Sequence, residues 1–175
     1  MQDKAHPFWK FSLQIYAKPG VDLTCLALQD EYGGDVNLLL FCCWQGCMGR
    51  SLNKRFMRKV MAAVADWQLQ VVQPLRLARR NISKGYPAMP PQRSMALRNS
   101  IANAELDAEY LEQLLLVRCL AENSSTFRKS HPAMAIAANL RRYFNLLEIP
   151  LEVSIQQHAE VLLAASRSNP PTGKA

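Results

Sequence analysis

Residues 35–48, DVNLLLFCCWQGCM, decide the fold of this chain. Asp35 is a favoured helix N-cap residue, and the residues after it are apolar on nearly every side of a helix. Such a helix offers no face to water, so its neighbours must cover it all round. The stretch therefore predicts a central, buried helix.

Asn37 is the polar exception near the start of this helix. A buried Asn must find hydrogen-bond partners, so we expect Asp35 and Asn37 to fix the beginning of the helix. The alternative is a small-molecule site in the same region, made by Asp35, Asn37 and Trp44.

Apolar residues recur with the period of a helix in nearly all of the remaining chain. No stretch shows the alternation of apolar and polar residues that is typical of a strand. The sequence predicts an all-α fold, a compact multi-helix bundle. Pro74 lies inside the long fourth segment and predicts a kink or a break there. Besides the central helix, the predicted helices span residues 7–17, 21–32, 52–82, 100–122, 132–147 and 151–166.

Residues 83–95, SKGYPAMPPQRSM, are dense in Pro and Gly and are the best candidate for a linker. This linker divides the chain into an N-terminal helical module, residues 1–82, and C-terminal helices, residues 96–166. Residues 167–175 are expected to form a flexible tail.

The sequence lacks the signals that mark several classes of protein. No apolar run reaches the ~18 residues that cross a bilayer, and the first residues do not read as a signal peptide. We therefore expect a cytoplasmic protein without membrane contact. The five Cys and three His lack metal-ligand spacing, and no catalytic motif is present. No metal, cofactor or catalytic residue is predicted, and a non-enzymatic role is favoured over an enzymatic one.

The positive charge of the chain is concentrated in one segment. Residues 50–98 hold eleven Lys and Arg residues against a single acidic residue, Asp66, whereas the flanking segments are slightly negative. On a straight helix, most of these cations share one sector, opposite the apolar residues. The predicted basic face contains Lys54, Arg55, Arg58, Lys59, Arg76, Arg79 and Arg80.

Ordinary solvated helix faces mix charges of both signs, so this face calls for an anionic partner. We expect a polyanion, RNA or a ribosomal surface, bound through its phosphates without base stacking. An acidic protein is another partner, and an adaptor role would let the C-terminal helices choose it. The remaining alternatives are a plainly solvated face and pairing within the chain, by the acidic residues Glu105, Asp107, Glu109 and Glu112.

Three motifs carry a resemblance to a known family. They are FWKFSLQIYAKPGV at residues 8–21, DVNLLLF at residues 35–41 and PLRLARR at residues 74–80. In this combination the chain resembles an uncharacterised proteobacterial protein family over about residues 8–82. The resemblance implies a cytoplasmic bacterial protein and brings no activity or catalytic residues with it.

Overall fold

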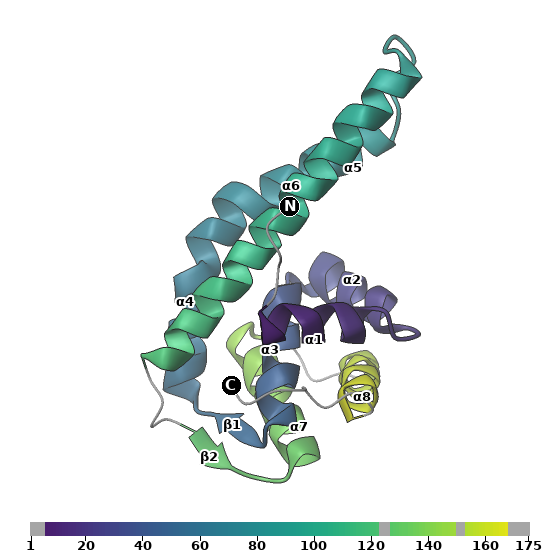
Figure 1. Ribbon diagram of the computed structural model, residues 1–175. Helices are drawn as coiled ribbons and strands as arrows, with labels where there is room; N and C mark the ends of the chain where they lie inside the picture. Colours follow the sequence, from purple (N-terminus) through teal and green to yellow (C-terminus); the bar gives the residue numbers. More distant parts are fainter. Residues whose placement is uncertain (1–5, 123–126, 150–152, 168–175) are drawn as a thin grey trace.

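The computed structural model describes residues 6–122, 127–149 and 153–167, and it confirms the predicted all-α fold (Figure 1). Helix α3, Val36–Cys47, lies at the centre, and every residue from Asn37 to Gly46 is buried. The central position of this helix follows from the apolar character of its whole circumference. The prediction made from residues 35–48 is therefore confirmed.

Helices from both ends of the chain pack around α3 and form the body of the molecule. Helices α1, Pro7–Tyr16, and α2, Val21–Tyr32, precede it in the chain, and α7, Pro132–Leu146, and α8, Val153–Arg167, follow near the C-terminus. Figure 1 shows these helices gathered into a compact body, with α1 and α2 on one side of α3. Large apolar side chains from α1, α3 and α7 fill the core, among them Phe8, Phe11, Phe41, Trp44, Tyr143 and Phe144.

Local capping explains several helix ends. The Asp35 carboxylate accepts hydrogen bonds from the backbone N–H groups of Asn37, at 2.8 Å, and Leu38, at 3.2 Å, as expected of an N-cap. Gly33 ends α2 with a φ of +67°, a conformation that glycine adopts without steric cost. These contacts lie within a few residues of each other, so sequence alone predicts them well.

The long fourth helix is interrupted by a π-helical turn. It consists of α4, Lys54–Trp67, the turn η1, Gln68–Val72, and α5, Gln73–Ser83. The Gln73 N–H donates to the Gln68 carbonyl, one residue further back than in an α-helix. The turn lies just before Pro74, whose ring would clash with the preceding turn of a regular helix. The sequence predicts an interruption at Pro74, and the structure places it on the preceding residues.

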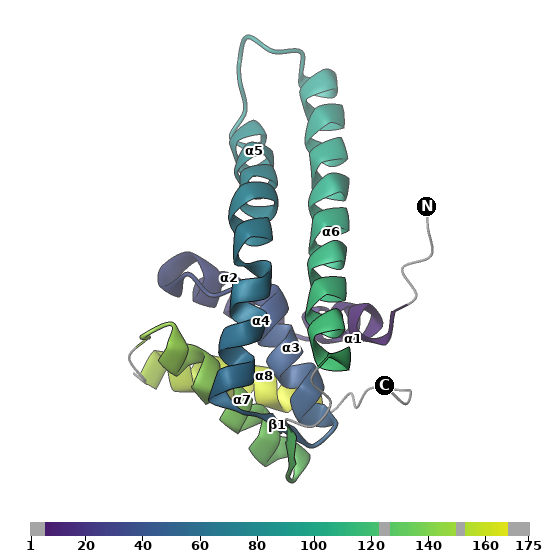
Figure 2. The same ribbon diagram turned by 90° about the vertical axis from the view of Figure 1, so that its left-hand side faces the viewer.

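Helix α6, Pro91–Ala121, begins nine residues earlier than the prediction at residue 100. It runs antiparallel to α4 and α5 and forms with them a long hairpin that projects from the body (Figure 2). In this hairpin, the turn between α5 and α6 is the Pro- and Gly-rich segment. The proline at residue 91 begins α6, a position that tolerates its missing N–H group.

A small antiparallel sheet was missed by the sequence reasoning. Strand β1, Arg50–Leu52, pairs with β2, Phe127–Lys129, with Ser51 opposite Arg128. Strands of three residues are too short to show a two-residue alternation, and their pairing joins distant parts of the chain. Among the described residues, no helix is long and apolar enough to span a membrane.

Candidate functional site

The two halves of the predicted basic face lie in different environments. The side chain of Arg76 is only 14% exposed and that of Arg79 is 26% exposed, whereas Leu77 between them is 60% exposed. A π turn inserts one extra residue, which rotates the following helix by about 100° relative to a straight α-helix. The rotation directs Arg76 and Arg79 towards α6 and leaves Leu77 in solvent.

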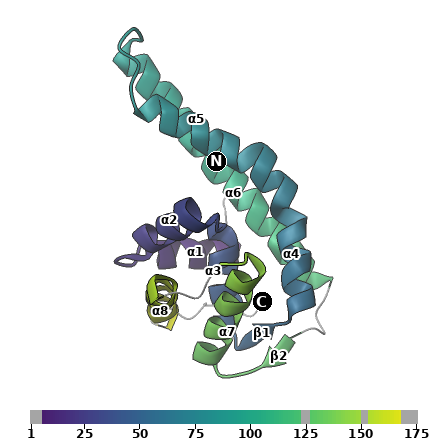
Figure 3. The same cartoon turned by 180° about the vertical axis from the view of Figure 1, so that it is seen from behind.

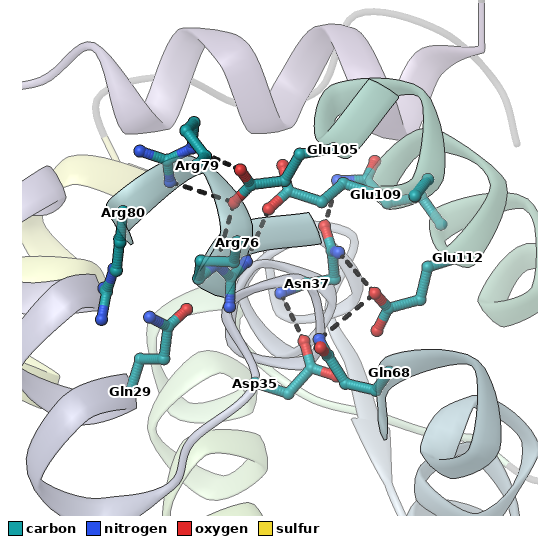
Figure 4. Close-up of polar contacts among 12 residues, drawn as sticks. Gln29, Asp35, Asn37, Gln68, Arg76, Arg79, Arg80, Glu105, Glu109 and Glu112 are labelled. Carbon is teal, nitrogen blue, oxygen red and sulfur yellow. Dashed lines mark hydrogen bonds and ion pairs between the residues drawn. The ribbon is translucent and has the colours of Figure 1, made fainter. Parts of the chain in front are cut away.

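Carboxylates of α6 engage these arginines (Figure 4). Arg76 donates from Nε to Glu105, at 2.9 Å, and from Nη2 to Glu109, at 2.7 Å. Arg79 donates to both carboxylate oxygens of Glu105, at 2.5 and 3.1 Å. Of the alternatives that the sequence left open, pairing within the chain is therefore present at Arg76 and Arg79, through Glu105 and Glu109.

Burial and ion pairing act in opposite directions on these carboxyl groups. Burial favours the neutral form of Glu105, but hydrogen bonds from Arg79 and Arg76 outweigh it and lower the pKa of Glu105. At Glu109 burial dominates and raises the pKa, although the charge of Arg76 opposes it. Glu105 is therefore the firmly ionised partner of the arginines.

The other cations of the predicted face are exposed. Arg80 pairs with Asp30 of α2 at 3.0 Å, and Lys59 pairs with Glu122 at 3.2 Å, both on the surface. Such pairs contribute little to stability because water screens them. Lys54, Arg55 and Arg58 are exposed on α4, and within the described part of the chain none of them pairs with a carboxylate.

These cations lie beside others that the sequence reasoning did not group with them. Lys54 lines a hollow of about 250 Å³ together with Arg141 and Arg142 of α7. It also lines a second hollow, of about 360 Å³, with Arg58 and the exposed Glu148. Arg128 and Lys129 lie nearby on β2, which pairs with the residues just before α4 (Figure 3). We call the exposed cations at this end of the molecule the basic end: Lys54, Arg55, Arg58, Arg128, Lys129 and Arg141.

A buried polar network lies beneath the arginines and fixes α3 against α6. The Asn37 side chain donates to Glu112 at 2.9 Å and accepts from Gln113 at 2.8 Å. Gln113 also donates to Ser12 of α1 at 3.1 Å, and Gln68 of η1 donates to Glu112 at 3.3 Å. Asp35 and Asn37 therefore have the hydrogen-bond partners that their predicted structural role requires.

The network contains two carboxyl groups that face each other without a cation between them. Oδ2 of Asp35 and Oε1 of Glu112 are buried and lack a hydrogen-bond partner among the described residues. Burial and the charge of Asp35 raise the pKa of Glu112 to about 10. Glu112 therefore keeps its proton at neutral pH.

Trp44 does not join this network. Its ring stacks on Phe8 at a centroid distance of 4.8 Å inside the core, whereas Asn37 lies in the network. Asp35 lines a hollow beside Arg76 and Arg80, Asn37 lines a cavity between the hairpin and the body, and Trp44 lines neither of the two. The small-molecule site of Asp35, Asn37 and Trp44 stays a prediction. Gln68 and Gln113 were not selected from the sequence, and Glu112 was named only as a possible partner of the basic face, although Glu105, Glu112 and Leu116 share a buried face of α6.

The comparisons with known proteins place the chain in a family. A family model described as "Protein of unknown function (DUF2390)" matches residues 7–116. The chain therefore belongs to this family, and the match extends beyond the region of about residues 8–82 in which the resemblance is visible. No curated protein matches the chain, and no solved structure does.

Proposed function

We propose that this member of the DUF2390 family binds a polyanion through its basic end. The polyanion that we propose is RNA, contacted through its phosphates. The observation that carries the proposal is the set of exposed cations at the start of α4 that have no carboxylate partner among the described residues. Arg76 and Arg79, which the sequence also nominated, serve instead to hold α5 against α6.

The position of these cations on α4 strengthens the argument. The N-terminus of a helix is its positive end, where acidic residues are favourable and cations are not. The first turn of α4 has no acidic residue and begins with Lys54 and Arg55. A bound anion would relieve this unfavourable arrangement, because phosphate oxygens can contact both the side chains and the helix end.

The basic end supports contact with phosphates rather than with bases. The aromatic residues of α4 and α7 are buried or half-buried, so these helices offer no exposed ring on which a base could stack. Binding through phosphates alone is indifferent to sequence and depends strongly on salt. We therefore expect similar affinity for unrelated single-stranded RNA sequences.

Fluorescence anisotropy with a labelled RNA of 20 nucleotides tests this proposal. If about four phosphates are neutralised, the slope of log K against log salt is about −3 for a single strand. The double variant Lys54→Glu and Arg58→Glu should weaken binding more than about tenfold, because it reverses two charges of the basic end.

The matched control reverses two charges elsewhere. Lys84 and Arg93 lie at the exposed far end of the hairpin, and the variant Lys84→Glu and Arg93→Glu has the same net charge as the test variant. We expect it to bind like the parent protein. Equal weakening by both variants would show that only net charge matters, and absence of RNA binding by the parent would end the proposal. Binding of an acidic protein instead of RNA would also contradict it.

A further inference from the structure

A cavity of about 430 Å³ lies between the hairpin and the body, away from the basic end. Helices α1 and α2 form one wall, α5 and α6 form the other, and Asn37 and Gln113 of the polar network lie among its lining residues. Its volume is within the range typical of small-molecule sites. Figure 4 shows the arginines and glutamates that border it.

Large apolar side chains line this cavity and remain accessible to solvent. Leu13 and Tyr16 of α1 are 52% and 37% exposed, Leu26 of α2 is 38% exposed, and Leu106 of α6 is 46% exposed. A single exposed leucine is ordinary, but here four apolar residues from three helices line one concave space. This arrangement favours a ligand with an apolar body.

The charged side chains that line the cavity indicate which charge a ligand would carry. Arg76 and Arg79 are paired with Glu105 and Glu109, and Arg80 is paired with Asp30. Arg98 donates only to neutral oxygens, those of Ser83 at 3.2 Å and Asn99 at 3.1 Å. Among the described cations of this cavity, Arg98 is therefore the one whose charge no carboxylate balances.

We propose that the cavity binds an amphipathic organic monoanion, a carboxylic acid with a hydrocarbon or aromatic body. The carboxylate pairs with Arg98, and the body lies between Leu13 and Leu106. Arg is suited to this role because its guanidinium group binds a carboxylate through two parallel hydrogen bonds. This site is separate from the basic end, so the inference does not depend on RNA binding.

The fluorescent probe 8-anilinonaphthalene-1-sulfonate, an aromatic monoanion, tests the site in the full chain. We expect its fluorescence to rise on binding and to fall again when dodecanoate is added below its micelle concentration. Dodecyltrimethylammonium has a similar chain but a positive charge, and acetate has the negative charge without the chain. Neither should displace the probe, and displacement by either would contradict the proposed ligand class.

Two variants of α6 and two matched controls locate the probe. Arg98→Gln and Leu106→Glu should each weaken probe binding at least tenfold. Arg93→Gln and Leu97→Glu make the same changes at exposed positions of α6 that do not line the cavity, and they should bind as the parent does. Circular dichroism confirms that each variant is folded. Equal affinity in all four variants, or loss only in the controls, would overturn the inference.

Discussion

At the scale of single residues, the most informative group is Glu112. It is fully buried, hydrogen-bonded to Asn37 and Gln68, and adjacent to Asp35. Glu112 holds its proton more tightly in the folded chain, with a pKa of about 10, than in the unfolded chain, at 4.5. Its contribution to stability is therefore fully present below pH 4.5 and is lost as the pH rises towards 10.

The variant Glu112→Gln tests this assignment. Gln has the shape of a protonated Glu, and its amide can donate to Asp35 while its oxygen accepts from Asn37. We expect the free energy of unfolding of the parent to fall between pH 6 and pH 9.5, and that of the variant to fall much less. Urea denaturation at several pH values measures both slopes. Equal slopes would show that Glu112 is ionised in the folded protein.

At the scale of helices, the crossing of α3 and α7 depends on Gly46. A Cβ at this position would lie 2.6 Å from the backbone N and Cα atoms of Ile136 and 2.5 Å from its Cγ1 atom. Backbone atoms cannot rotate away as a side chain can, so any larger residue must push the helices apart. Gly46 therefore sets the distance between these helices.

Gly46→Ala should lower the free energy of unfolding by about 2 kcal/mol or more, even though Ala is the better helix former. Chemical denaturation measures the loss. Asn103→Ala, a change at an exposed position of α6, should alter stability by less than about 0.5 kcal/mol. A Gly46→Ala variant as stable as the parent would mean that α3 and α7 separate without cost.

The contrast between these helices and the arginines shows what sequence can predict. The N-cap at Asp35 and the burial of α3 depend on neighbouring residues, so the sequence predicts them. The orientation of Arg76 depends on one extra residue in the turn before Pro74, which rotates every later side chain. The acidic residues of α6 were recognised as possible partners, but only the hairpin geometry selects Glu105 and Glu109. The division of the chain at residues 83–95 and the adaptor role stay predictions.

At the scale of the whole molecule, the hairpin and the body differ in how they are stabilised. Helix α5 and the part of α6 before Glu105 contain no buried residue, whereas α3 is buried along almost its whole length. Ion pairs from Arg76 and Arg79 to Glu105 link α5 to α6, and the exposed pair of Arg80 with Asp30 adds little because water screens it. Regions with few buried apolar contacts open locally at lower free energy than the core.

Amide hydrogen exchange measures this difference directly. Protection in residues 91–104 should be at least about a hundredfold lower than in residues 38–46, because the outer hairpin can open without exposing the core. Glu105→Gln should accelerate exchange further in α5 and the outer part of α6, since it removes the negative charge that both Arg76 and Arg79 contact. Exchange in α3 should stay close to that of the parent. Equal acceleration in α3 would mean that hairpin and body open together as one cooperative unit, and that Glu105 stabilises the whole molecule.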